Sequence, residues 1–307
     1  SAAFFCNYVE NTILGSKDFG SSYTTRLANL KTKGWKIYTT LDLSLQKQAQ
    51  KAVDRYVPQT PTGSADVGAS TVSLQVGTGR VLTMVQNKTF KPNGAKDRTK
   101  YSAINYSTDE ALGAGAGFQP GSTFKAYTLI GWLKSGHTIN QSVNGNQRVI
   151  PQSDFTSSCG GVGGAPWDLH NDENEKGNFT VQEGTARSIN GVFASLDEEQ
   201  DLCQLGDLMD TRGVKNVFTG GKMRVAPTMA IGAASTVAPL DNAVGYATIA
   251  NQGVRCDAIG IDKVVDSSGK SLPVPKANCR RVQDKQLIIA AGYDLHNPLH
   301  GTMYSDN

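Results

Sequence analysis

The stretch Gly117-Phe-Gln-Pro-Gly-Ser-Thr-Phe-Lys125 places a serine and a lysine three positions apart at the start of a predicted helix. Residues with this spacing lie on one face of a helix, so the Lys125 amine can lie beside the Ser122 hydroxyl. A serine hydroxyl becomes a good nucleophile when a base removes its proton. A lysine whose pKa is lowered by burial can be that base. The spacing therefore predicts a nucleophile and its base.

The Ser-x-x-Lys pattern also fits an ordinary helix start, in which Ser122 caps the helix and Lys125 is solvated. The neighbouring sequence favours the catalytic interpretation. Glycines at 113–117 and the Pro120-Gly121 pair predict a turn before Ser122, and proline suits the entry to a helix. Residues 126–133 are apolar nearly all round, which is typical of a buried helix. A buried helix supplies the low-dielectric surroundings that activation of the pair requires.

A second candidate motif lies downstream in Thr185-Ala-Arg-Ser-Ile-Asn190, which contains a Ser-x-Asn triplet formed by Ser188 and Asn190. Ser-x-x-Lys followed by Ser-x-Asn is the order of the first two motifs of penicillin-binding proteins and serine β-lactamases. The sequence around both motifs resembles the transpeptidase domain of class A penicillin-binding proteins. For Ser188 and Asn190 the competing interpretation is helix capping.

Two further stretches carry the same resemblance. Trp35-Lys-Ile-Tyr-Thr-Thr-Leu-Asp-Leu-Ser-Leu-Gln46 is similar to the entry of that domain, where a strand leads into its first helix. Residues 237–253 are similar to the long helix between the second and third motifs. The resemblance covers roughly residues 30 to 300. It implies an α+β fold with an antiparallel sheet of about five strands and a helical subdomain.

The resemblance also implies a reaction. Ser122 would attack the carbonyl of the penultimate D-alanine of a peptidoglycan stem peptide, with Lys125 as the base. Ser188 would relay a proton to the leaving amine, and Asn190 would position the substrate amide. An acceptor amine from a second stem would then crosslink the wall, while β-lactam antibiotics would acylate Ser122. No metal or organic cofactor is required.

One part of the family pattern is absent. The third motif, Lys-Thr-Gly, occurs nowhere, since the stretches Lys222-Met-Arg and Lys270-Ser-Leu have the wrong residues. Family order places it just beyond Gly301-Thr302. We expect it in a remaining C-terminal segment, which could be a separate chain. The fold would then lack its last strands, and the fragment would be poorly stable with an exposed strand edge. The alternative is a degenerate, inactive homologue.

Composition and the architecture of the resembled family limit the possible partners and the cellular location. A net charge of +3 and the lack of a Lys/Arg cluster argue against nucleic acid as a partner. No apolar run reaches membrane-spanning length. Class A proteins carry a membrane anchor and a glycosyltransferase domain upstream of this domain. We therefore expect residues 1–34 to be an irregular lead-in and 35–307 to be the transpeptidase domain, at the extracytoplasmic face of a bacterial cell membrane.

Five cysteines are present. Cys256 and Cys279 flank a predicted hairpin, with strands at 259–265 and 271–274, so we expect them to form a disulfide in an oxidising compartment. Cys159 and Cys203 are a weaker second pair, which leaves Cys6 free or bonded elsewhere. A metal site is not favoured, because no Cys-x-x-Cys occurs and Pro298 lies between His296 and His300.

Hydrophobic periodicity predicts the remaining elements. We expect strands at 35–40, 67–76 and 80–85, and helices at 42–57, 122–135, 180–195, 198–211, 239–251 and 283–294.

Two other functions remain open from the sequence. A serine β-lactamase would use the same pair with fast deacylation, but Glu173-Asn-Glu175 does not resemble the Glu-x-x-Leu-Asn loop of the class A enzymes. A β-lactam-sensing or scaffolding module would be acylated without turnover.

Overall fold

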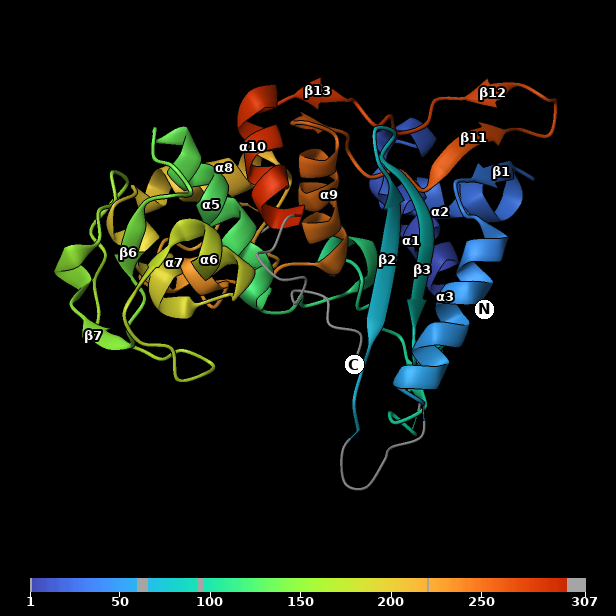
Figure 1. The fold of residues 1–307 in the computed structure, drawn as a ribbon. Coiled ribbons are helices and arrows are strands. Elements are labelled where there is room, and N and C mark those ends of the chain that lie inside the picture. Colours follow the sequence, from blue (N-terminus) through green and yellow to red (C-terminus); the bar gives the residue numbers. More distant parts are fainter. Residues whose placement is uncertain (1, 60–65, 93–95, 220, 297–307) are drawn as a thin grey trace. The chain divides into compact units, whose positions relative to one another are not determined.

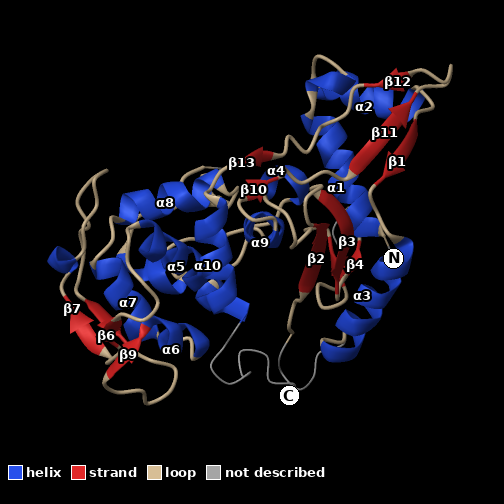
Figure 2. Cartoon of the chain, turned by 45° about the horizontal axis from the view of Figure 1, so that its top comes forward, coloured by secondary structure: helices blue, strands red, loops and turns tan. Residues whose placement is uncertain are grey.

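The chain divides into two compact units in the computed structural model (Figures 1 and 2). The structure describes residues 2–59, 66–92, 96–219 and 221–296. The first unit comprises residues 1–118, 237–248 and 255–280, and the second comprises 119–236, 249–254 and 281–307. Among the described residues, no helix is long and apolar enough to cross a membrane.

The first unit combines short helices with antiparallel strands. In chain order its elements are α1 (Ala3–Gly15), η1 (Lys17–Phe19), α2 (Tyr23–Thr32), β1 (Lys36–Thr39), α3 (Leu43–Tyr56), β2 (Ser70–Gln75), β3 (Arg80–Gln86), β4 (Thr89–Phe90), β5 (Tyr101–Ser102), α4 (Glu110–Gly113), most of α9 (Pro239–Ala250), β11 (Ile261–Val265) and β12 (Ser271–Leu272). Strands β10 (Val254–Arg255) and β13 (Arg280–Arg281) fall at the unit boundaries.

Helix α1 belongs to the core of this unit. Phe5, Tyr8 and Ile13 are buried and cluster with Met84 of β3 and Val264 of β11. The expectation of an irregular lead-in over residues 1–34 is therefore wrong for the local structure, since α1 and α2 are regular helices. Apolar residues spread around α1 gave no one-sided helical stripe, which is why periodicity missed it.

Both hairpins that the sequence predicts are present in the first unit, as the pairs β2–β3 and β11–β12. β1 pairs antiparallel with β11, and β11 pairs with β12, in a three-stranded sheet. β2 and β3 form a separate antiparallel pair (Figure 1), and their register places Ser70 opposite Gln86. The Thr40 hydroxyl joins the two groups by donating to the carbonyls of Val81 and Ile259. In the described part of the chain β2 pairs only with β3.

The second unit is mainly helical. Its elements are η2 (Gly121–Phe124), α5 (Lys125–Lys134), β6 (Ser142–Asn144), β7 (Arg148–Ile150), η3 (Gln152–Asp154), β8 (Trp167–Leu169), β9 (Asn178–Thr180), α6 (Val181–Ala186), α7 (Asn190–Glu198), α8 (Leu202–Thr211), η4 (Pro227–Ile231) and α10 (Lys285–His296).

Helix α5 is the central element of this unit. Every residue from Lys125 to Trp132 is buried, as the all-round apolar sequence predicts. Leu129 and Trp132 cluster with Val192 and Phe193 of α7. The helix expected at 122–135 is thus present, but its first turn is the 3₁₀ turn η2. The helix expected at 180–195 is wrong as one element, because it is broken between α6 and α7.

Both expected disulfides are present. Cys256 and Cys279 are joined with their Cα atoms 4.0 Å apart, and Cys159 and Cys203 with theirs 5.8 Å apart. Cys6 is free and exposed. The second bridge ties the loop after η3 to the start of α8, where the Asp201 carboxylate also caps the helix by accepting from the Cys203 N–H at 2.8 Å.

If α1 is part of the core, truncating Ile13 must destabilise the first unit. Ile13 is fully buried, so Ile13→Ala should lower the free energy of unfolding by about 2–5 kcal/mol. Leu43→Ala is the matched control, because Leu43 is 62% exposed, and it should change that free energy by about 0.5 kcal/mol or less. Urea unfolding of both variants checks this. Equal, small effects would show that α1 is a dispensable lead-in.

Candidate active site

Ser122 lies in the 3₁₀ turn η2, directly before α5. A 3₁₀ turn brings residues i and i+3 onto the same line, which places Ser122 above Lys125, the first residue of α5. Ser122 is exposed, whereas Lys125 is buried. The exposed serine thus lies one 3₁₀ turn before the buried lysine.

A close approach of two glycines shapes this turn. Gly121 has φ +57° and Gly232, which follows η4, has φ +69°. A Cβ atom on Gly232 would lie 2.3 Å from the Gly121 carbonyl oxygen, closer than any side chain allows. Both positions need glycine because of positive φ, and Gly232 also because of this contact. The segment that ends at Gly232 thus supports the serine turn from outside the helix.

The Lys125 amine is surrounded by oxygen acceptors from the second motif. Its Nζ lies 2.5 Å from the Ser188 carbonyl oxygen, 2.9 Å from Ser188 Oγ and 2.7 Å from Asn190 Oδ1. The Phe193 ring packs 5.4 Å away. An ammonium group has three donors, and these three oxygens accept all of them.

These partners permit two protonation states. The Ser188 carbonyl and Asn190 Oδ1 can only accept, so they hold two N–H bonds in either state. Ser188 Oγ is a hydroxyl, which can accept from an ammonium or donate to a neutral amine. The third position of the amine is therefore suited to proton exchange.

Burial also favours the neutral amine. It lowers the pKa of Lys125 to about 8, against the opposing charges of Asp172 and Glu175. Near neutral pH a small fraction of the amine is then unprotonated, enough for a general base.

The Ser122 hydroxyl does not yet take part in this cluster. Within the described residues its Oγ makes no hydrogen bond, and the Lys125 amine is directed to Ser188 and Asn190. The structure thus brings three of the four expected residues into contact and places Ser122 one turn away. Catalytic hydrogen bonds are often formed only with substrate bound.

Ser188 occupies an unusual backbone conformation. It ends α6 in a left-handed conformation with φ +54°, in the position usually taken by glycine. The Ser188 N–H donates to Thr185 O, and the Ile189 N–H donates to Gly184 O, which is the Schellman pattern of a helix end. The chain reverses here, so both oxygen atoms of Ser188 reach the Lys125 amine.

Asn190 is held in one orientation at the first position of α7. Its Nδ2 donates to the His170 carbonyl at 2.9 Å, so its Oδ1 faces Lys125. Sequence reasoning missed His170, Asn171, Asp172 and Glu175. No motif marks them, because their role depends on a loop folding back onto α7.

Comparison with known proteins decides the family. The family described as "Penicillin binding protein transpeptidase domain" matches residues 69–289, a span that includes both motifs. The chain belongs to this family. The expected α+β fold of penicillin-binding proteins is confirmed. The expected third-motif position, beyond Gly301-Thr302, lies outside the described residues.

Several named proteins are similar to this chain. "Penicillin-binding protein 1A" of Aquifex aeolicus is 27% identical over 227 residues, covering 72% of this chain and 26% of that protein. "Peptidoglycan D,D-transpeptidase PbpA" of Mycolicibacterium smegmatis is 24% identical over 277 residues, covering 80% and 52%. The chain thus spans between a quarter and about half of these curated relatives.

Solved structures share the fold. Penicillin-binding protein PonA1 from Mycobacterium tuberculosis has a TM-score of 0.69 at 19% identity, covering 92% of this chain and 68% of that one. PonA1 in complex with penicillin V has a TM-score of 0.67 at 19% identity, covering 94% and 70%. The imipenem acyl-enzyme of penicillin-binding protein A from the same organism has a TM-score of 0.66 at 19% identity, covering 89% and 67%.

Replacement of Ser188 should separate its backbone role, the left-handed end of α6, from the role of its hydroxyl as a partner of Lys125. A left-handed conformation costs a non-glycine residue about 1–2 kcal/mol, so Ser188→Gly should be at least as stable as wild type and more stable than Ser188→Ala. Both variants lose the hydroxyl that contacts Lys125, so both should react more slowly with a fluorescent penicillin. Thermal unfolding and labelling rates check this. Wild-type labelling in Ser188→Gly would show that the hydroxyl is dispensable.

Proposed function

We propose that this chain is the acyl-transfer domain of a peptidoglycan D,D-transpeptidase, in which Ser122 forms the acyl-enzyme. The observation that carries the proposal is the buried Lys125 amine, held by Ser188 and Asn190 one turn below an exposed serine. Family membership supports it, as does the name of the M. smegmatis relative.

The first half-reaction forms an ester. Ser122 Oγ bonds to the carbonyl carbon of the penultimate D-alanine while Lys125 Nζ takes the hydroxyl proton. The bond to the terminal D-alanine nitrogen then breaks, and that nitrogen receives a proton from Lys125 through the Ser188 hydroxyl. The Ser122 backbone N–H, in the first turn of η2, would stabilise the oxyanion. Loss of such a donor costs about 10²–10³ in rate.

The second half-reaction reverses these proton transfers. An acceptor amine from a neighbouring stem peptide attacks the ester carbon and gives its proton to Lys125. The Ser122 oxygen leaves and is reprotonated, which yields the crosslink. We propose that the second oxyanion donor lies on a Lys-Thr-Gly strand of a C-terminal segment, either in the same chain or in a separate one. No metal or organic cofactor enters either step.

β-lactams would react at the first step, the acylation of Ser122. The ring carbonyl would replace the D-alanine carbonyl, and Ser122 would keep a long-lived ester. The relatives solved with penicillin V and as an imipenem acyl-enzyme support this ligand class. The two disulfides support a location outside the cytoplasm. We propose the extracytoplasmic face of the bacterial membrane, with a transpeptidase domain whose core includes α1 as well as residues after 35, following a glycosyltransferase domain and a membrane anchor.

One observation favours hydrolysis as a second candidate activity. The Glu175 side chain is buried, and its Oε2 has no hydrogen-bond partner among the described residues. It also interacts electrostatically with Lys125. A carboxylate beside the base is a group that can activate water. Recovery of penicillin-labelled protein within seconds would identify a β-lactamase, and stable label without crosslinking of lipid-linked precursor would identify a sensor.

Removal of the nucleophile provides the direct test. In the complete protein, Ser122→Ala should reduce labelling by a fluorescent penicillin to background, because no other group forms the ester. Ser153→Ala is the control, since Ser153 is an exposed serine of the same unit whose hydroxyl, among the described residues, bonds to Asp154 alone. Its labelling should equal that of wild type. Labelling that survives Ser122→Ala rules out Ser122 as the nucleophile.

The pH dependence of acylation tests the base. Only the neutral amine accepts a proton, so the second-order rate constant should rise with pH and level off above the Lys125 pKa of about 8. Well below that value the rate should rise about tenfold per pH unit. Lys125→Arg should be inactive at every pH, because a guanidinium stays protonated. A rate that falls as pH rises through this range would contradict the assignment.

A further inference from the structure

The second motif depends on how the start of α7 is held. Asn190 and Gly191 begin this helix, and the Asn190 amide contacts the Lys125 amine. The first N–H groups of a helix have no partner within it. Something outside α7 must therefore satisfy them and fix the position of Asn190.

The Asn171 side chain supplies that contact. Its Oδ1 accepts from the Gly191 N–H at 2.8 Å. Its Nδ2 donates to the Gly145 carbonyl at 2.8 Å and to the Glu175 carbonyl at 3.2 Å. One side chain thus joins three segments: the start of α7, the loop after β6 and the turn at 170–175.

The loop after β6 presses closely on α7. A Cβ atom on Gly191 would lie 2.2 Å from the Gly145 carbonyl oxygen. Asn171 bonds to both residues of this contact, on the Gly191 N–H and on the Gly145 carbonyl. Asn171 therefore joins two backbone segments that already pack too closely to move toward each other.

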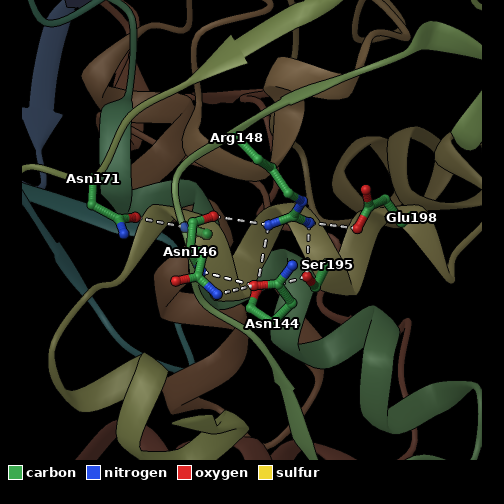
Figure 3. Close-up of polar contacts among 7 residues, drawn as sticks. Asn144, Asn146, Arg148, Asn171, Ser195 and Glu198 are labelled. Atoms are coloured by element: carbon green, nitrogen blue, oxygen red, sulfur yellow. Dashed lines mark hydrogen bonds and ion pairs between the residues drawn. The ribbon is translucent and has the colours of Figure 1, made fainter. Parts of the chain in front are cut away.

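That loop is itself anchored further along α7 (Figure 3). Arg148 Nη2 donates to Ser195 Oγ at 2.9 Å and pairs with Glu198 Oε2 at 2.6 Å. Ser195 Oγ donates to the Asn144 carbonyl at 2.8 Å. The loop is thus fixed near the end of α7 by Arg148, and at the start of α7 by Asn171.

The turn that Asn171 holds also carries charge. Asp172 and Glu175 are the charged groups that interact with the Lys125 amine, and Phe193 of α7 faces it as an apolar ring. Because Asn171 Nδ2 bonds the Glu175 carbonyl, it fixes the backbone of this turn. The same side chain thus governs both the Asn190 amide and the nearby carboxylates.

We propose that Asn171 is a positioning residue for acylation, which holds the start of α7 so that Asn190 Oδ1 stays on the Lys125 amine. The inference rests on the proposed function, because its readout is acylation of Ser122. Asn171 does not touch the reacting atoms; it acts through Gly191 and Asn190.

Asn171→Ala in the complete protein tests this inference. Without the tether, the Lys125 ammonium loses hydrogen-bonding and charge partners, which favours the neutral amine. The midpoint of the pH–rate profile for penicillin acylation should fall by about half a unit to one unit. The plateau rate should fall about tenfold to a hundredfold, because the base is misplaced.

Two variants make the result decisive. Asn146→Ala removes the same kind of side chain from the loop after β6, where Asn146 Oδ1 accepts from the Gly177 N–H at 2.9 Å and Nδ2 donates to Asn144 Oδ1; among the described residues this side chain makes no bond to α7. Its profile midpoint should match wild type. Asn171→Asp keeps the acceptor for the Gly191 N–H and adds negative charge, so its midpoint should not fall and its plateau rate should stay within about tenfold of wild type.

The outcomes separate the two proposals. A wild-type profile in folded Asn171→Ala, or a lower rate with an unmoved midpoint, overturns the positioning role. If Asn171→Ala does not fold, a larger than tenfold loss in Asn171→Asp overturns it. Labelling of Ser122→Ala as fast as wild type would instead overturn the proposed function and leave the role of Asn171 without its reaction.

Discussion

The site depends on one constraint: a lysine amine is buried and must be satisfied by oxygen atoms at fixed positions. Burial alone would leave Lys125 neutral and loosely placed. Three oxygen atoms from Ser188 and Asn190 hold it instead, and nearby carboxylates partly offset the loss of solvent. The architecture of the second unit serves this requirement, because α5 provides the burial while the α6–α7 junction provides the oxygen atoms.

At the α6–α7 junction, one residue is held in an unfavourable backbone conformation that directs its oxygen atoms into the site. Ser188 takes a conformation that glycine adopts more easily, and the Schellman hydrogen bonds of α6 enforce it. At Gly184 a Cβ atom would lie 2.5 Å from Val192 Cγ1, so the two helices could not approach as they do with a larger residue there. The strain at one residue is thus maintained by packing at its neighbours.

The sequence was informative where chemistry and spacing coincide. The Ser-x-x-Lys turn, the buried α5, the β2–β3 hairpin and both disulfides follow from residue types and their positions. It was misleading at α1, whose apolar residues surround the helix without a stripe, and at 180–195, where helical sequence continues across Ser188. A break at a serine has no residue signature, because tertiary contacts impose it. Asn171 could not be identified for the same reason: its partners come from three separate segments.

The contact between Gly121 and Gly232 has a consequence for folding order. Gly232 is far from the serine turn in sequence, yet its backbone lies against Gly121 with no space for a side chain. The turn that carries Ser122 is thus supported on its outer side only after the segment at 227–232 has packed against it. A nascent polypeptide would contain the nucleophile and the lysine well before they are correctly arranged. Chemical reactivity should therefore emerge as a late event in maturation.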